Sequence, residues 1–461
     1  WIILQQHFIR CGCHEKSAVS MYAIDSLRQL AMKYLEKDEL ANYNFQKSFL
    51  KPFEVVFATT PSDVVKEFII QCFLPLVTAR TKRICSGWKT IFTVLTLAAA
   101  DGNTRACTQS AFQLAANISR SCFDIVSANF FRELCDTLLR FGRNVSFTDV
   151  AKGAVEELET CTDRYVVKYM AAHAGEPETL FSDSLSSLNT WFPVLRGLCD
   201  VSAHPHIDVR TAALKVLFSV FNSYGAQFTH AFWELAFRGV LLPLFGSVGY
   251  SHGAIRGCIN PEWLNTTCLQ ALQYLVLLFS KFFGTLNFLL SDVLAMLSAF
   301  AMDTNVDLAN IGCTYLYQCV LDNAPRFTPA MWAQFDAVVK HFFNGHNNML
   351  KVLHQRALGK QISSPVVNAC QEEKKRSTTK DEEEEEELPE EEIVRCCKVC
   401  GKNETVAELV ECPMCTGTYY CCEQCQQTDW PTHSTTCLES YKVQDMVPGG
   451  AVEPPQQQQQ Q

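Results

Sequence analysis

The stretch "PHIDVRTAALKVLFSVF" (205–221) decides the fold. After a polar start around Asp208, its apolar residues recur at the spacing of an α-helix, and the alternation typical of a β-strand is missing. The side chains that would face inward are Ala213, Leu214, Leu217 and Phe218. The sequence therefore predicts an α-helix with one buried face, beginning near Asp208 and packed against other elements.

The same helical pattern recurs through most of the first 345 residues. Further candidate helices lie at 105–120, 126–142, 148–160, 187–202, 207–224, 230–246, 264–282, 286–301, 306–321 and 329–343. Helices of this length joined by short turns predict stacked antiparallel pairs, so we expect an all-α fold, a HEAT/armadillo-like helical solenoid over residues 1–345. A single irregular all-helical domain is the alternative, since the spacing is too irregular to count a period of about 40 residues.

Charge is concentrated in one segment. Residues 381–387 and 390–392 hold ten acidic residues, which account for the whole net charge of −10. Residues 346–394 are therefore predicted to be an acidic low-complexity linker, and the tail 441–461, rich in Pro and Gln, to be disordered. No basic field remains to attract nucleic acid or an anionic membrane. No apolar run reaches 18 residues uninterrupted, so we expect any membrane association to be peripheral.

A dense group of metal-ligand residue types follows the linker, at 396–437. It holds nine of the 23 cysteines and one histidine, whereas the other 14 cysteines are scattered, mostly singly, as in a protein from a reducing compartment. So short a segment cannot build a sufficient hydrophobic core without a cross-link such as a bound metal ion. Thiolate and imidazole ligands suit structural zinc. The ligand pairs that the spacing predicts are Cys397 and Cys400, Cys412 and Cys415, Cys421 and Cys425, and His433 and Cys437.

Eight ligands suffice for two zinc ions, and one choice stays open. Cys422 with Cys425 is as feasible a pair as Cys421 with Cys425. The segment "YCCEQCQQTDWPTHSTTC" (420–437) resembles the second half of a MYND finger, although that family prefers serine at the position of Cys422. We therefore identify residues 395–440 as a MYND-type finger.

The MYND resemblance implies more than metal binding. It implies one zinc on Cys397, Cys400, Cys421 and Cys425, and a second on Cys412, Cys415, His433 and Cys437. It also implies a groove for short proline-containing peptides, lined by Gln426 and Trp430; the alternative is that Trp430 only fills the small core. Three basic residues stand against five acidic ones between 395 and 437, which argues against phosphate binding.

The helical body also resembles a known family. The stretches "AIDSLRQLAMKYLEKDELANYNFQKSFLKPF" (23–53), "SGWKTIFTVLTLAAAD" (86–101) and "WFPVLRGLCDVSAHPHIDVRTAALKVLFSVFNSYG" (191–225) match, in order, regions downstream of the catalytic domain in large brefeldin-A-inhibited, Sec-seven and BIG-type exchange factors for Arf GTPases. The resemblance implies a regulatory and targeting role on Golgi or endosomal membranes, partly through small GTPases of the Arf or Rab type. Nothing in this chain matches the catalytic domain of those proteins.

We expect no catalytic residue in this chain. A glycine-rich phosphate loop and a His-Glu-x-x-His motif are both missing, and isolated serines and histidines in helices do not define a triad. Four tryptophans, Trp88, Trp191, Trp233 and Trp332, are expected in the core. The alternative function is a free-standing helical scaffold with a MYND adaptor, possibly nuclear, with no role in nucleotide exchange.

Overall fold

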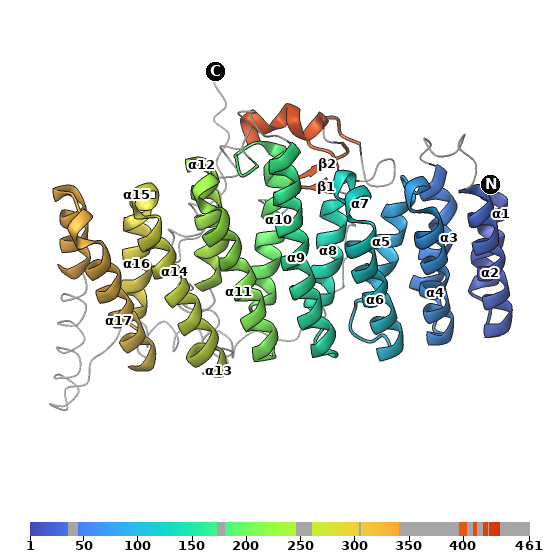
Figure 1. Cartoon of the computed structure of the whole chain (residues 1–461), viewed down its shortest axis with the longest axis horizontal. Coiled ribbons are helices and arrows are strands. Elements are labelled where there is room, and N and C mark those ends of the chain that lie inside the picture. Colours follow the sequence, from blue (N-terminus) through green and yellow to red (C-terminus); the bar gives the residue numbers. More distant parts are fainter. Residues whose placement is uncertain are drawn as a thin grey trace, which may run out of the picture. The chain divides into compact units, whose positions relative to one another are not determined.

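The computed structural model describes residues 1–35, 45–172, 180–245, 261–303, 306–340, 396–402, 409–412, 418–422 and 424–433. Residues 1–282 form one compact unit, and residues 283–437 belong to a second. The first unit consists of helices that follow one another in a row, coloured blue to green in Figure 1. The predicted all-α fold is confirmed.

The first unit has two layers of helices. One layer is formed by α1 (Ile2–Gly12), α3 (Phe45–Thr59), α5 (Gly87–Ala98), α8 (Phe131–Gly142), α10 (Leu185–Val201) and α12 (His230–Ala236). The other is formed by α2 (Ser17–Tyr34), α4 (Asp63–Arg80), α6 (Arg105–Ser121), α9 (Thr148–Ala172), α11 (Ile207–Tyr224) and α14 (Leu269–Lys281). Successive helices of a layer pack on one another, α12 through its continuation η4 (Phe237–Leu241). Stacked pairs of this kind are the predicted HEAT-like solenoid.

Short elements connect these helices. In the first unit they are η2 (Thr81–Arg83), α7 (Phe123–Asn129), η3 (Gly225–Gln227), η5 (Pro243–Phe245), α13 (Pro261–Trp263) and η6 (Leu264–Cys268). The range 126–142 was predicted as one helix but contains a break, because Phe130, with φ −134° and ψ 21°, separates α7 from α8. In the other direction, α9 continues to Ala172, well beyond the expected end at 160.

Side-chain hydrogen bonds tie each interhelix turn to the turn before it. The Asn144 amide nitrogen donates to the Ala99 carbonyl at 2.9 Å, and His204 Nε2 lies 3.0 Å from the Asn144 carbonyl. One pair later, Trp263 Nε1 donates to the Ser202 carbonyl at 3.1 Å. These contacts satisfy turn carbonyls that would otherwise be buried without a donor, so they fix how successive pairs stack.

Arg210 is one of the three charged residues of the stretch that opened the sequence analysis, and it is almost completely buried, with 1% exposure. Its guanidinium donates to the carbonyls of His204 (3.0 Å) and Pro205 (2.6 Å) and to Thr267 Oγ1 (2.8 Å) in the next pair. Its second terminal nitrogen lies 3.3 Å from a Glu262 carboxylate oxygen. The guanidinium of Arg210 therefore links the turn before α11 to the following helix pair.

Three of the four tryptophans expected in the core lie there, as do most of the described single cysteines. Trp88, Trp191 and Trp233 are fully buried, but Trp332 is 43% exposed, so its assignment to the core was wrong. Burial raises the pKa of the Cys72 and Cys268 thiols to about 12, which keeps them protonated. These thiols therefore pack as small hydrophobic groups.

The second unit begins with a short set of helices. These are α15 (Phe283–Leu286), η7 (Asn287–Leu289), α16 (Leu290–Ala301), α17 (Val306–Asn323) and η8 (Ala324–Arg326), followed by helical residues at 329–340. α16 packs on α17, and Gly312 permits the close approach, since a Cβ there would lie 2.3 Å from the backbone nitrogen of Ala301.

One apolar segment in this unit has the length of a membrane span. Phe283–Ala301 has a mean hydropathy of 1.5. By length and composition it could cross a membrane, although 56% of it is buried inside the protein. The sequence analysis counted no uninterrupted span in this region, because polar residues such as Asp292 break the apolar run. Core helices share this composition, and the packing of α16 on α17 accounts for it.

Candidate metal centre

The finger is built on a small β-structure and one helical segment. β1 (Val410–Glu411) and β2 (Tyr419–Tyr420) pair antiparallel, with Glu411 opposite Tyr419. The Lys398 nitrogen donates to the Tyr419 carbonyl at 2.9 Å, which attaches the first cysteine turn to β2. Residues 424–433 are helical. Three segments that are apart in the sequence are thus held together in the finger.

Four thiols meet where these segments join. The sulfurs of Cys397, Cys400, Cys421 and Cys425 all lie within 4.8 Å of one another. The first two lie on a turn closed by the Gly401 nitrogen, which donates to the Cys397 carbonyl at 2.9 Å. Gly401 has φ +71°, a conformation that glycine adopts without steric cost, so the glycine after Cys400 is explained by the turn.

The donor set fits a tetrahedral zinc ion. With Zn–S bonds of about 2.3 Å, the sulfurs of a regular tetrahedron are about 3.8 Å apart. The sulfur of Cys421 lies 3.3 Å from that of Cys400 and 3.7 Å from that of Cys425. The cluster therefore has the size of a four-thiolate site and needs only small side-chain adjustments to hold the ion.

The electrostatics of this turn favour a thiolate at Cys397. Burial opposes the charge, but hydrogen bonds with the backbone at Cys400, Cys421 and Val399 outweigh it and lower the pKa of Cys397 to about 6. Metal ligation requires the deprotonated sulfur. The backbone thus prepares one of the four ligands before any ion arrives.

Two of the four ligands predicted for the second zinc ion, Cys412 and His433, lie among the described residues. His433 Nε2 lies 3.3 Å from the Cys412 sulfur, close to the separation of about 3.6 Å between nitrogen and sulfur ligands on one tetrahedral zinc. Both residues are buried, at 4% and 5% exposure. Cys415 and Cys437, the other two predicted ligands, lie outside the described residues.

The remaining predicted residues occupy different environments. Gln426 is buried, Trp430 is half-buried, and the rings of Trp430 and His433 have centroids 6.2 Å apart. Among the cysteines left over by the pairing, Cys396 and Cys422 are exposed, and neither belongs to the four-thiol cluster.

Sequence reasoning missed one polar contact in the finger. The Tyr420 hydroxyl donates to Asp429 Oδ2 at 2.7 Å, and Lys398 Nζ lies 3.3 Å from the same oxygen. This contact joins β2, the helical segment and the first cysteine turn. The signal in the sequence is that Tyr420 and Asp429 each stand directly before a residue predicted to bind metal or peptide.

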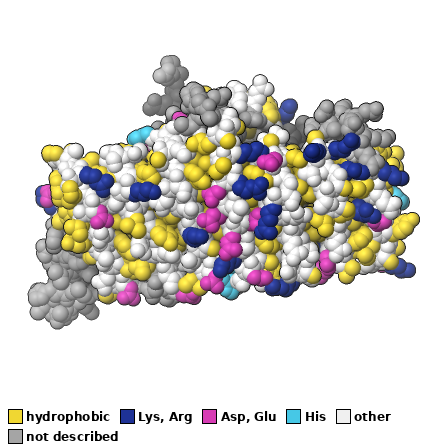
Figure 2. Space-filling model, in the orientation of Figure 1, with side chains coloured by type: hydrophobic (Ala, Val, Ile, Leu, Met, Phe, Trp, Pro, Cys, Tyr) yellow, Lys and Arg dark blue, Asp and Glu magenta, His cyan; other side chains and the backbone are white. Residues whose placement is uncertain are grey.

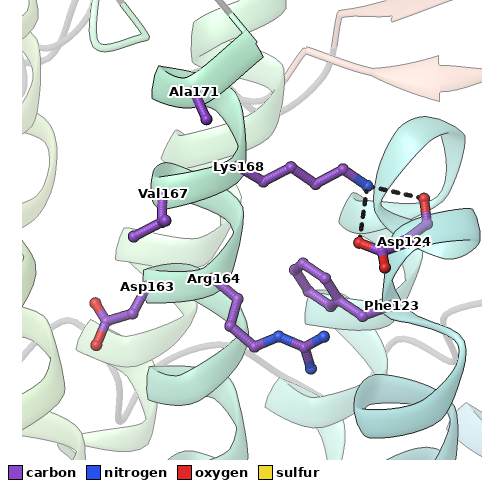
Figure 3. Close-up of a pocket in the computed structure, with 7 residues that line it drawn as sticks. All are labelled: Phe123, Asp124, Asp163, Arg164, Val167, Lys168 and Ala171. Atoms are coloured by element: carbon purple, nitrogen blue, oxygen red, sulfur yellow. Dashed lines mark hydrogen bonds and ion pairs between the residues drawn. The ribbon is translucent and has the colours of Figure 1, made fainter.

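An open cavity of about 390 Å³ lies between α7 and α9 (Figure 3). Arg164 stacks on Phe123 at 4.2 Å, and Lys168 Nζ lies 2.9 Å from the Asp124 carbonyl and 3.3 Å from its carboxylate. Asp163 points away from these cations and accepts a hydrogen bond from the Tyr224 hydroxyl. Each of these charged groups thus has a partner, Asp124 and Lys168 in each other, and the lining residues offer no nucleophile with an adjacent base.

The surface charges of the body are mixed. On the face seen in Figure 2, basic and acidic side chains are interspersed with scattered apolar ones, and neither sign forms a broad field. Several charges of the body are paired, as in Arg105 with Asp149 (2.6 Å) and Arg143 with Asp200 (2.9 Å). This face lacks the single-sign potential that nucleic-acid binding requires.

Comparison with known proteins identifies both parts. The family model for the Mon2/Sec7/BIG1-like HDS region matches residues 33–117, and the MYND finger model matches residues 397–437. The chain joins a Sec7-like HDS region to a MYND finger. The two resemblances seen in the sequence are therefore confirmed.

Curated relatives of the Sec7 and BIG type extend the first match. Brefeldin A-inhibited guanine nucleotide-exchange protein 3 of Arabidopsis thaliana is 31% identical over 368 residues, covering 74% of this chain. Brefeldin A-inhibited guanine nucleotide-exchange protein 1 of Mus musculus is 31% identical over 72% of the chain. The ADP-ribosylation factor guanine nucleotide-exchange factor SEC7 of Saccharomyces cerevisiae is 29% identical over 75% of the chain. The matches cover 21%, 18% and 18% of those proteins, so the chain corresponds to about a fifth of their length.

Proposed function

We propose that this chain is a non-catalytic regulatory and targeting segment of a large Arf guanine nucleotide exchange factor. The observation that carries the proposal is the homology to exchange proteins over about three quarters of the chain, with the family model lying in the HDS region. The stacked helix pairs support it, because repeat arrays present long surfaces for other proteins.

The proposed partners follow from the same homology. We assign small GTPases of the Arf or Rab type to the helical body, with peripheral association on Golgi or endosomal membranes. The mixed charges of the visible face favour recruitment by a protein over recruitment by lipid charge. The cytoplasmic face of those membranes is therefore the proposed location.

Two assays test this role with the 461-residue chain. In the first, the chain is added to Arf loaded with a fluorescent GDP, and we expect no acceleration of nucleotide release. In the second, flotation with liposomes should depend on a GTP-loaded small GTPase and hardly on anionic lipid. Acceleration of release, or equal flotation with and without every GTPase tried, would contradict the proposal.

For the finger we propose two structural zinc ions. Cys397, Cys400, Cys421 and Cys425 hold the first. The second is held by Cys412, Cys415, His433 and Cys437. The tetrahedral size of the first cluster and the contact between Cys412 and His433 support this assignment. Metal analysis should give two zinc ions per chain, and one or none after His433→Ala.

The proposed ligand of the finger is a short proline-containing peptide at Gln426 and Trp430. Trp430 is half-buried and can offer part of its ring, whereas Gln426 is buried and would support the groove from beneath. Trp430→Ala should keep the wild-type zinc content and weaken peptide capture in a binding titration. Loss of zinc in this variant would instead assign Trp430 to the core alone.

A further inference from the structure

The first cluster has a fifth sulfur beside it. The Cys422 sulfur lies 3.9 Å from that of Cys421, which in turn lies 3.7 Å from that of Cys425. Cys422 thus lies directly beside a ligand of its own segment. A four-coordinate zinc ion does not bind a fifth thiolate, so ligation in the intact finger does not explain why this exposed side chain lies beside the cluster.

The local backbone explains how two adjacent cysteines reach one place. Residues 421 and 422 lie in a bend, whereas residues 396 and 397 lie in extended, bridged backbone. Successive side chains of an extended segment point to opposite faces. Cys396 is therefore directed away when Cys397 faces the cluster. At the bend, by contrast, the sulfurs of Cys421 and Cys422 stay close together.

We propose that Cys422 is a reserve ligand for the first metal site: when Cys421 is lost or chemically blocked, the Cys422 sulfur takes its coordination position. The proposal rests on the proposed zinc site. In the intact finger the Cys421 thiolate is bound and Cys422 is a spectator. Without Cys421, the Cys422 thiol releases its proton to solvent and its sulfur forms the fourth metal–sulfur bond, so the charge of the site is unchanged.

The chain supplies its own control. Cys397 has the adjacent thiol of Cys396, but in extended backbone, and Cys400 has no cysteine next to it. Reserve ligation at the bend should therefore rescue loss of Cys421 and should not rescue loss of Cys397 or Cys400. Cys400 is exposed, so Cys400→Ser is the better control if loss of the buried Cys397 unfolds the finger.

The experiment uses the full chain and six forms: wild type, Cys421→Ser, Cys422→Ser, the double variant of these two, Cys397→Ser and Cys400→Ser. Zinc per chain is measured after gel filtration. Cobalt(II) then replaces zinc, and the intensity of the thiolate-to-cobalt charge-transfer absorption reports the number of sulfurs per bound ion. The cobalt measurement matters because a water molecule could replace a missing sulfur and leave the metal content unchanged.

We expect Cys421→Ser and Cys422→Ser each to retain the zinc content and the charge-transfer intensity of the wild type. The double variant, Cys397→Ser and Cys400→Ser should each lose one zinc or the intensity of one thiolate. The proposal is overturned if Cys421→Ser behaves like Cys400→Ser, or if Cys422→Ser alone loses a ligand. A wild-type chain without zinc would instead refute the zinc site itself.

Discussion

At the scale of single residues, buried polar groups determine how neighbouring helix pairs meet. His204 lies in the turn before α11 and Arg210 in the first turn of that helix, and both are satisfied by backbone atoms around this turn or by groups of an adjacent pair. A buried polar group is costly when its partner is removed, much more than its net contribution when paired suggests. Substitutions at these two residues should therefore have large effects.

Arg210→Ala removes the donor to two carbonyls and to Thr267 Oγ1. We expect the free energy of unfolding to fall by about 2–4 kcal/mol, because these acceptors stay buried without a partner. Arg210→Lys should recover only part of the loss, since an ammonium cannot reproduce the forked geometry of the guanidinium. Denaturant unfolding measures both.

The control for Arg210 is Lys215→Ala, on the same helix. Lys215 is exposed and lies 3.6 Å from Glu159, a surface pair that contributes about 0–1 kcal/mol. If Arg210→Ala were no more destabilising than Lys215→Ala, the linking role of Arg210 would be wrong.

His204 should make stability depend on pH. Its Nε2 lies 3.0 Å from the Asn144 carbonyl, and its Nδ1 accepts from the His206 nitrogen at 3.1 Å, a pattern that fits the neutral ring. Desolvation lowers the pKa of His204. The unfolded chain then takes up the proton first, at about pH 6.5, and stability is lost as the pH falls from there through the folded-state pKa.

The measurement is the free energy of unfolding between pH 8 and pH 5, for the wild type and for His204→Gln. Because glutamine does not titrate, the variant should show a smaller loss of stability toward low pH. Parallel curves for the two proteins would mean that His204 is not the group responsible.

At the scale of helices and turns, the apolar period predicted where most helices run but not where they are interrupted. The helices around Leu214 and Leu275 formed as expected, because their buried faces are continuous. The break at Phe130 is a change of backbone direction, with φ −134° and ψ 21°, which the apolar period does not record. Trp332 fits a helical face equally well whether or not a neighbour covers it.

The same limit applies to the finger. Spacing named the four cysteines of the first cluster as candidates, and the structure brings them together, but it left Cys421 and Cys422 as alternatives, since both are feasible pairs with Cys425. The bend at 421 and 422 places the first within the cluster and the second beside it. Backbone direction at one peptide unit decides this, and residue spacing carries no information on it.

Gly312 in α17 offers a test at this scale. A Cβ there would lie 2.3 Å from Ala301 N and 2.6 Å from Phe300 C, both backbone atoms that cannot rotate away. We expect Gly312→Ala to force α16 and α17 apart and to lower the free energy of unfolding by about 3 kcal/mol. Hydrogen exchange of α16 and α17 should then accelerate.

Gly284→Ala is the matched control. Nothing lies within 4 Å of a Cβ at Gly284, in α15, so alanine should be neutral or raise stability by about 0.5 kcal/mol. Similar exchange rates in the two variants would show that the contact between α16 and α17 tolerates an added methyl group.

At the scale of the whole molecule, the helical body and the finger should be stabilised by different interactions. The body buries a continuous apolar core, and among the described residues the one cluster of four metal-ligand side chains lies in the finger. A chelator should therefore leave the far-UV circular dichroism almost unchanged while unfolding the finger, for which metal binding supplies most of the folding free energy.

Limited proteolysis monitors the finger in the same samples. Cleavage around Tyr420 should become fast after chelation and slow again when zinc is restored. A large loss of helical signal on chelation would place a structural metal in the body as well.

The hydrogen bonds between successive turns have a mechanical consequence. In residues 1–282 they join positions such as Ala99 to Asn144 and Ser202 to Trp263, 45 and 61 residues apart, so each helix pair is fastened to its neighbours. Interfaces arranged in this way act as springs in series: each carries the full load, and their extensions add. A pull on the two ends of the stack should lengthen it by many small, reversible changes of angle before any pair opens. Optical tweezers would record this as a gradual rise in force followed by separate steps, one helix pair at a time.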